Sequence, residues 1–266
     1  MSRPPTERRS ITVIFPAYNE AANIRRAIEQ SMEAMYSRFD SFELLIINDG
    51  SRDETGSIAE ELAALYPEIT VLHHGRNLGL GEVLYHAFQC AKGDLVIQNA
   101  MDYPLDLRDL DILLPLLDDA DVVVAARKAH AGYSPYRKLT SKVNRGLLRL
   151  LFEPKLCDYN YTQLYKRVVL EAARPTSRST VFIAPEIIIR AHELGFRITE
   201  VEVDYHPRIA GQATSGNPRV ILRSLGDMFI FWAKRFFTGN RCSRPWSTIR
   251  GRKAASAIAR LNHESR

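Results

Sequence analysis

The sequence predicts an α/β fold: a single domain with a mostly parallel central sheet, followed by a helical extension at the C-terminal end. The first observation behind this prediction is that short apolar segments alternate with longer helical ones. The predicted strands are residues 11–15, 42–47, 70–73, 94–98 and 122–125. The second observation is that polar turn residues gather directly after these strands, where open parallel sheets bind their ligands.

Start and stop signals support a helix after most of these strands. Asn19 or Asn23 can cap the first helix, and Pro67 ends the second. Gly93 is the residue type expected just past the end of the third. Helices between strands are typical of the crossovers that join parallel neighbours. The predicted helices are residues 21–35, 55–66, 80–92 and 107–117.

The second half of the chain shows a looser pattern. Residues 127–144 are basic and mostly polar, which predicts a loop leading into an amphipathic helix at residues 144–152. A strand is predicted at residues 198–203, between helices at residues 182–194 and 220–237. We therefore expect one domain over residues 9–216, an amphipathic C-terminal helix over residues 217–240 and a basic, mobile tail over residues 241–266.

The composition is that of an ordinary globular protein. Of 266 residues, 45% are hydrophobic and 25% charged, and the net charge of +5 does not demand nucleic acid. Such a charge also suits phosphate-bearing substrates or an anionic membrane face. The three cysteines form no CxxC pair, so neither a disulfide framework nor a zinc site is expected. The polar N-terminus and the absence of an apolar run of about 18 residues predict a cytoplasmic protein without a membrane span.

Two polar turns on successive strands carry the strongest chemical signal. One is PAYNE at residues 16–20, and the other is NDGS at residues 48–51. A carboxylate at such a strand end can accept hydrogen bonds from the N–H groups of a nucleotide base and from ribose hydroxyls. Either turn, taken alone, is equally well explained by the ordinary turn preferences of Asn, Asp, Gly and Ser.

Several longer segments resemble one protein family. They are VIFPAYNE at residues 13–20, INDGSRDET at 47–55, NLGLG at 77–81, AKGDLVIQ at 91–98 and EVEVDYHPRIAG at 200–211. With them the chain resembles the family 2 glycosyltransferases over residues 11–216. The resemblance is closest to the branch of dolichyl-phosphate mannose synthase and other polyprenyl-phosphate glycosyltransferases. It implies the Rossmann-like glycosyltransferase-A fold and transfer of a sugar from a nucleoside diphosphate sugar.

The resemblance also implies a site for the donor nucleotide. In that site Asp49 would contact the base, and Asn77 and Gly81 would shape the loop beside it. Leu80 departs from the family pattern, which usually has a basic residue there, so the corresponding phosphate contact is not expected. The residues of the implied donor site are Pro16, Tyr18, Glu20, Asp49, Asn77, Gly81 and Asn99.

The metal motif of the family is altered in this chain. The family carries Asp-x-Asp after the fourth strand, where hard oxygen ligands hold Mg2+ or Mn2+ on the donor diphosphate. The aligned residues here are Asn99, Ala100 and Met101, followed by Asp102. Three interpretations stay open: Asp102 binds the metal from a shifted loop, basic residues replace the metal, or the site is impaired. We favour the first, against the simpler view that Asp102 only caps the turn before Pro104.

A basic segment after the fifth strand suggests the acceptor. In the lipid-phosphate branch, an arginine after this strand, a second arginine, and a serine followed by a basic residue bind the acceptor phosphate. Arginine suits the geometry of phosphate oxygens. A solvated, charged surface explains the same residues equally well. The residues that match the branch are Arg127, Arg137, Ser141 and Lys142.

The favoured reaction is an inverting transfer to a phosphate acceptor, with a polyprenyl phosphate as partner. A phosphate is already anionic and needs no general base, and the adjacent Glu-Asp pair of relatives with hydroxyl acceptors is missing here. If the acceptor is a hydroxyl, Glu186 is the best candidate base. Arg208 lies in a closing turn that resembles a lid. Arg127 or Arg208 would stabilise the leaving group if no metal binds.

Other functions remain compatible with these residues. One is transfer to a hydroxyl of a small molecule or glycan, and another is a catalytically weak sugar-nucleotide binder that has lost Asp-x-Asp. The apolar helix at residues 220–237 would either pack into the core or lie on a membrane surface. In the second case the protein would be peripheral on the inner face of the membrane.

Overall fold

A seven-stranded sheet forms the centre of the computed structural model, which describes residues 8–127, 135–153, 155–204 and 218–238. The strand order is β3-β2-β1-β4-β6-β5-β7. Only β6 runs antiparallel to its neighbours β4 and β5 among the described strands, so the prediction of a mostly parallel sheet is confirmed. The strands are β1 (Ile11–Ala17), β2 (Phe42–Asn48), β3 (Ile69–His73), β4 (Leu95–Gln98), β5 (Val122–Arg127), β6 (Thr162–Lys166) and β7 (Ile198–Val203).

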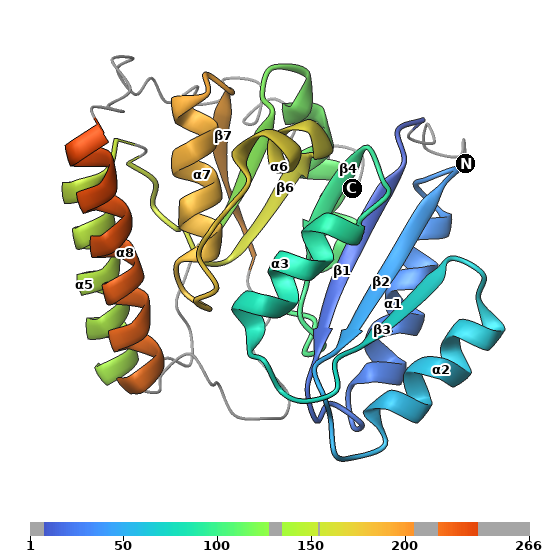
Figure 1. The fold of residues 1–266 in the computed structure, drawn as a ribbon. Helices are drawn as coiled ribbons and strands as arrows, with labels where there is room; N and C mark the ends of the chain where they lie inside the picture. Colours follow the sequence, from blue (N-terminus) through green and yellow to red (C-terminus); the bar gives the residue numbers. More distant parts are fainter. Residues whose placement is uncertain (1–7, 128–134, 154, 205–217, 239–266) are drawn as a thin grey trace.

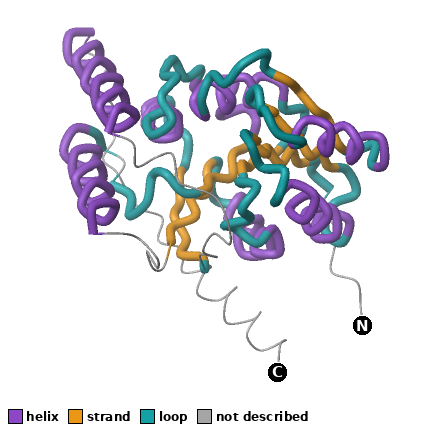
Figure 2. The backbone as a smooth tube through the Cα atoms, turned by 90° about the horizontal axis from the view of Figure 1, so that it is seen from below, coloured by secondary structure: helices purple, strands orange, loops and turns teal. Residues whose placement is uncertain are grey.

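Helices cover both faces of this sheet (Figures 1 and 2). The helices α5 and α8 lie side by side at one end of the molecule (Figure 1), and Phe152, the residue after α5, packs on Phe231 of α8. The helices are α1 (Ile24–Tyr36), α2 (Thr55–Leu65), α3 (Leu80–Cys90), α4 (Leu110–Leu113), α5 (Pro135–Leu151), α6 (Arg167–Ala173), α7 (Ile183–Glu193) and α8 (Pro218–Thr238).

Two apolar cores, one on each face of the sheet, follow from the alternation of side chains along the strands. Val13 and Phe15 of β1 belong to the core shared with α1, α2 and α4. Ile14, between them, belongs to the core shared with α3, α6 and α7. None of these three side chains has exposed surface. Because both faces of the central strands are buried, their sequences are continuous apolar runs rather than alternating apolar and polar residues.

Two of the predicted helix signals are corrected by the structure. Gly93 is not a left-handed cap, because α3 ends at Cys90 and Ala91 is already extended. A Cβ atom at Gly93 would lie 2.5 Å from the Thr12 nitrogen, so glycine is needed there for close packing against β1. Neither asparagine caps α1 through its side chain: Asn23 makes no such bond, and Asn19, with φ of 54°, bonds the loop after β2 instead.

Three further sequence predictions change. The predicted helix 107–117 is broken into a 3-10 turn, the short α4 and a second 3-10 turn that contains Pro115, which lacks an N–H donor. Residues 135–144, predicted as loop, form the first half of α5. The strand β6 was missed, because five residues between antiparallel neighbours carry no strand-helix alternation to reveal them.

The described residues contain no helix that is long and apolar enough to cross a bilayer. The boundaries predicted at residues 216 and 240, and the tail at residues 241–266, fall on or beside segments outside the described residues. Those domain boundaries stay predictions.

Candidate functional site

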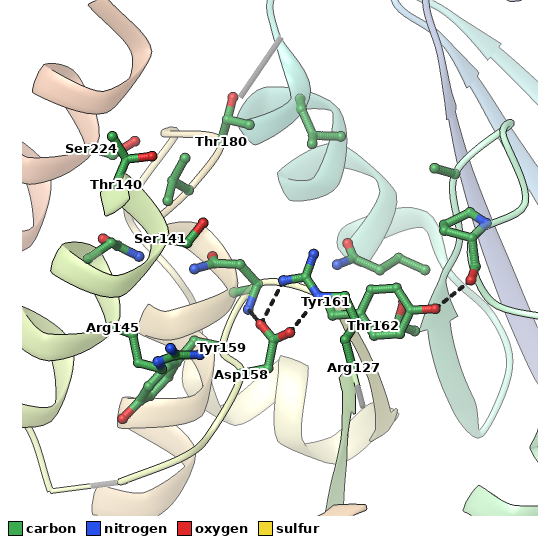
Figure 3. Close-up of a pocket in the computed structure, with 18 of the residues that line it drawn as sticks. Arg127, Thr140, Ser141, Arg145, Asp158, Tyr159, Tyr161, Thr162, Thr180 and Ser224 are labelled. Carbon is green, nitrogen blue, oxygen red and sulfur yellow. Dashed lines mark hydrogen bonds and ion pairs between the residues drawn. The ribbon is translucent and has the colours of Figure 1, made fainter. Parts of the chain in front are cut away.

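A pocket of about 460 Å³ opens at the carboxyl ends of the parallel strands. Pro16, Gln98 and Arg127 line it from β1, β4 and β5. The opposite wall is built by α5, α8 and the loop that leads into β6 (Figure 3). The pocket therefore lies at the edge of the sheet where parallel α/β folds bind ligands.

Arg127 is the best-anchored cation of this pocket. Its Nε and Nη2 atoms donate to Asp158, at 2.7 and 3.1 Å to the two carboxylate oxygens, and its guanidinium lies 5.2 Å from the Tyr161 ring centroid (Figure 3). The two charged side chains are 12% and 8% exposed. Tyr161 is fixed in turn, because its hydroxyl donates to the Pro104 carbonyl at 2.6 Å. This arrangement orients the guanidinium before any ligand arrives.

The loop that carries Asp158 is itself anchored to the sheet. Glu200 of β7 accepts hydrogen bonds from the backbone N–H groups of Cys157 and Asp158 at 2.8–3.0 Å. The Asn160 N–H donates to Asp158 at 3.1 Å. Burial and the neighbouring Glu200 both raise the pKa of the Cys157 thiol, which disfavours its thiolate.

The helix α5 turns one polar face towards the pocket. Ser141, Asn144 and Arg145 are spaced by one helical turn and line the pocket together. The guanidinium of Arg145 donates to the Cys157 carbonyl at 3.0 Å, which ties α5 to the loop before β6. Beside this face the pocket wall is apolar, with Leu139 and Val143 of α5 opposite Leu225 of α8.

The PAYNE and NDGS turns and the residues directly after them are joined by hydrogen bonds between residues that lie 32 or 33 positions apart in the sequence. Asn19 links them in two ways, because its N–H donates to the Ser51 hydroxyl at 3.0 Å and its side-chain oxygen accepts from the Arg52 N–H at 2.9 Å. The Ala21 N–H donates to Asp53. Burial works to raise the pKa of Asp53, but hydrogen bonds from the Thr55 side chain and from backbone N–H groups outweigh it and lower the pKa.

Asp49 lies below the surface at the end of β2 and is 3% exposed. Its Oδ1 accepts from the Leu78 N–H at 2.9 Å and faces the His74 ring nitrogen at 2.8 Å, while its Oδ2 accepts from the Gly79 N–H at 2.8 Å. The carboxylate therefore holds the loop before α3. A direct contact with a nucleotide base stays a prediction.

The turn after β4 offers one carboxylate to the pocket. The Asn99 amide is used within the turn, where it donates to the Leu105 carbonyl and accepts from the Ala100 N–H. Met101 is 2% exposed in the core, whereas Asp102 lines the pocket. Among the described residues no group of three His, Cys, Asp or Glu side chains is placed to hold a metal. The residues fit Mg2+ or Mn2+ only as a shared site, with Asp102 and ligand oxygens together.

The structure brings some of the predicted site residues together and leaves others apart. Lining the pocket are Pro16, Asn99, Asp102, Arg127 and Ser141. Outside its wall are Tyr18, Glu20, Asn77, Gly81 and Lys142. Gly81 packs so closely on Arg178 that a Cβ atom would lie 2.0 Å from its carbonyl oxygen. The side chain of Arg137 and all of Arg208 lie outside the described residues.

Glu186 does not reach the pocket and lies in a second cavity between α7 and α8. It has no exposed surface, and its carboxylate accepts hydrogen bonds from Thr176, Ser177 and Arg190 at 2.7–2.9 Å. A carboxylate with this many partners holds the loop before α7 in place. The expectation that Glu186 would be the base for a hydroxyl acceptor is therefore corrected, since Glu186 does not line the pocket.

Sequence reasoning missed several residues of the pocket. Tyr161, Thr180 and Ser224 line it from three separate segments, and no local pattern connects them. Arg145 belongs to the basic segment after the fifth strand but was not assigned to the phosphate site, although it lies four residues after Ser141 and hence on the same helix face. That spacing is a usable signal only if α5 begins near residue 135 rather than 144.

Solved structures share this fold. Glucosyl-3-phosphoglycerate synthase from Mycobacterium tuberculosis, in complex with Mn2+, UDP-glucose and phosphoglyceric acid, superposes with a TM-score of 0.65 at 20% identity. The alignment covers 85% of this chain and 80% of that one. At this identity the similarity shows the fold alone, which confirms the predicted glycosyltransferase-A architecture.

Sequence comparisons identify the family. Glycosyltransferase AglD from Haloferax volcanii is 31% identical over 222 residues, which cover 77% of this chain and 36% of that protein. Undecaprenyl-phosphate 4-deoxy-4-formamido-L-arabinose transferase from Proteus mirabilis is 24% identical over 76% of this chain and 62% of its own length. The chain thus spans about one third to three fifths of these relatives. The model of glycosyl transferase family 2 matches residues 12–173, and the chain belongs to that family.

Proposed function

We propose that the protein transfers a sugar from a nucleoside diphosphate sugar to a phosphate acceptor, with inversion, and that the acceptor is a polyprenyl phosphate. The observation that carries this proposal is the pairing of two arginines with an apolar wall in one pocket. Arg127 and Arg145 line it beside Leu139, Val143 and Leu225. A phosphate group and a hydrocarbon chain together match such a lining.

The small number of carboxylates among the described pocket residues supports a phosphate acceptor, since Asp102 is assigned to the metal. Among the described residues lining the pocket, the carboxylates are Asp102 and Asp158. Asp158 is committed to Arg127 by two hydrogen bonds. A phosphate oxygen can attack the anomeric carbon without losing a proton, whereas a hydroxyl acceptor needs a base within hydrogen-bond reach. The arginines would hold the acceptor opposite the leaving group and so favour inversion.

The donor is proposed to bind where the ends of β1 and β4 meet the loop before α3. Pro16, Asn99 and Leu80 line this part of the pocket. Asp102 is placed to share Mg2+ or Mn2+ with the donor diphosphate, and such an ion would neutralise charge on the leaving group. A protein that shares this fold is named for a complex with Mn2+ and UDP-glucose, which supports a nucleoside diphosphate sugar and a divalent ion as the ligands to test first.

Exposed apolar side chains on α5 and α8 support a lipid acceptor and a peripheral membrane location. Leu139 and Leu150 of α5 are 61% and 79% exposed, and Leu222 and Phe237 of α8 are 68% and 85% exposed. The relative from Proteus mirabilis is named for an undecaprenyl-phosphate acceptor. An acceptor presented at a bilayer would meet the pocket beside these two helices.

A second candidate function is favoured by the altered metal turn. With a single carboxylate there, the protein would bind a sugar nucleotide but turn it over slowly. Thermal unfolding with a panel of nucleoside diphosphate sugars, with and without Mg2+, tests donor binding. At 100 times the dissociation constant the correct donor should stabilise the fold by about 2.7 kcal/mol. If none of the sugar nucleotides raises the Tm, both functions are wrong.

A further inference from the structure

Two histidines extend from Asp49 in a chain of hydrogen bonds that the transfer reaction does not otherwise use. His74 Nδ1 lies 2.8 Å from Asp49 Oδ1, and His74 Nε2 lies 2.9 Å from His86 Nδ1. The two imidazole rings meet edge to face, with centroids 5.0 Å apart. The side chains of His74 and Asp49 are 11% and 4% exposed, so water competes little for these bonds.

The direction of the hydrogens along this chain follows from the groups at its end. Asp49 receives N–H groups from Leu78 and Gly79, as an ionised carboxylate does, so it can only accept. His74 Nδ1 must then carry the hydrogen, and in a neutral ring Nε2 is an acceptor. With His74 neutral, His86 Nδ1 donates to it. Asp49 thus fixes the tautomer of His74, and His86 holds the His74 ring in place against the carboxylate of Asp49.

On the side of Asp49 away from the histidines, this hydrogen-bond network reaches a loop with an unusual backbone. Asp49 holds the N–H groups of Leu78 and Gly79, and Gly79 has φ of 89°, a conformation that L side chains rarely adopt. The next residue, Leu80, begins α3 and lines the pocket, as does Leu84 one turn later. Moving the loop would therefore move one wall of the pocket.

We propose that His74 and His86 are positioning residues for the donor: through Asp49 they hold the loop 77–79 in the shape that receives the nucleotide. The assignment of the donor to this wall rests on the proposed function. The holding of the loop rests on the hydrogen bonds alone. The two parts can therefore be tested separately.

His73 provides a matched control beside His74. It is the last residue of β3, but its ring contacts Glu60 at 2.7 Å and the Asn48 amide at 2.9 Å, and its side chain is 42% exposed. It makes no contact with Asp49 among the described interactions. His73→Gln should leave the loop and the donor KM unchanged.

The experiment compares His86→Leu, His86→Asn and His73→Gln in the full chain. Hydrogen exchange at the Leu78 and Gly79 amides reports on the loop, and steady-state kinetics separate donor KM from kcat. His86→Leu should speed this exchange and raise the donor KM about tenfold or more, with kcat changed less than about twofold. His86→Asn should restore both values, because its amide nitrogen replaces Nδ1 as a donor.

The outcomes separate the two claims. Wild-type exchange at Leu78 and Gly79 in His86→Leu overturns the proposal. So does equal loosening in His86→Leu and His86→Asn, because it would indicate a packing effect rather than a hydrogen bond. Faster exchange in His86→Leu alone, in a protein that binds no sugar nucleotide, would support the holding of the loop and refute the proposed function. Unchanged exchange at β1 in the same samples shows that the fold is intact.

Discussion

At the residue scale, the arginines of the site are held in fixed orientations by neighbouring groups. Arg127 is fixed by Asp158 and by the Tyr161 ring, and Arg145 by the Cys157 carbonyl. Preorganised donors lower the entropy lost when a ligand is bound. The same contacts make these residues important for stability as well as for binding.

Asp158→Ala should destabilise the fold, because it leaves the largely buried Arg127 guanidinium without its partner. Removing one member of such a pair costs about 3 kcal/mol or more, which urea unfolding measures as a lower midpoint. Glu61→Ala is the matched control, since the Arg25–Glu61 pair is 45% and 61% exposed and should contribute less than about 1 kcal/mol. Equal losses in the two variants would contradict the role given to Asp158.

Asp102→Asn should raise the concentration of Mg2+ or Mn2+ needed for half-maximal transfer, because it removes the carboxylate that the turn after β4 offers to the pocket. The wild type should need more metal for half-maximal activity than relatives with two aspartates, since one ligand is missing. Asp111→Asn, which alters a carboxylate paired with Arg38 on the outer surface, should behave as the wild type. Activity that survives EDTA, or an unchanged metal profile in Asp102→Asn, would refute this assignment.

At the scale of elements, close packing decides which glycines are needed. Gly81, in the first turn of α3, leaves no room for a Cβ atom beside the Arg178 carbonyl. Gly146, within α5, has nothing within 4 Å of the same position. The two sites therefore make opposite predictions for the same substitution.

Gly81→Ala should destabilise the protein by about 1–3 kcal/mol, because α3 must shift away from the backbone before α7. Gly146→Ala should stabilise it by about 0.5–1 kcal/mol, since alanine restricts the unfolded chain and favours helix. Thermal or urea unfolding measures both. A stabilised Gly81→Ala would show that α3 does not pack on Arg178 as described.

Asp121 ties the start of β5 to both neighbouring strands, and its pKa makes this link sensitive to acid. Burial works to raise the pKa of Asp121, but hydrogen bonds from the Arg197 N–H and the Lys166 ammonium outweigh it and lower the pKa. A depressed folded pKa contributes stability that is complete above the unfolded value, about 3.9, and is lost as the pH falls through the folded value.

The unfolding free energy should therefore drop below about pH 4, and Asp121→Asn should flatten this drop. Urea midpoints at pH 7, 4 and 3 measure the effect. Asp94 and Asp53 have pKa values shifted in the same direction, so part of the acid dependence should remain in the variant. Asp40→Asn, at an exposed position, serves as the control for the loss of one carboxylate. An equally steep profile in Asp121→Asn would contradict the account.

The elements also show which features could be predicted from the sequence. Buried strands such as β1 and β2 were predictable, because their apolar runs depend only on local composition. The start of α5 was not, because its sequence is basic and mostly polar and was therefore interpreted as a loop. The strand β6 was not either, because its antiparallel pairing with β4 and β5 leaves no pattern in the local sequence. The motif turns were placed correctly at strand ends. Their bonding was not predictable, since Asn19 and Ser51 meet only in the folded chain.

At the scale of the whole molecule, the faces of the sheet provide stability and its carboxyl edge provides the binding pocket. Its two faces bury the apolar cores with α1, α2 and α4 on one side and α3, α6 and α7 on the other. Its carboxyl edge carries the pocket, and α5 and α8 border that pocket with exposed apolar side chains. This edge is where the proposed polar donor and lipid acceptor would meet.

The most direct measurement is transfer of a labelled sugar from nucleoside diphosphate sugars to a polyprenyl phosphate, with the matching polyprenol as the control acceptor. The account predicts labelled lipid only with the phosphate, and an acceptor KM raised about tenfold in Arg145→Gln with donor KM unchanged. Label on the polyprenol, or transfer in Arg145→Gln that matches the wild type, would contradict a phosphate acceptor held between α5 and the sheet.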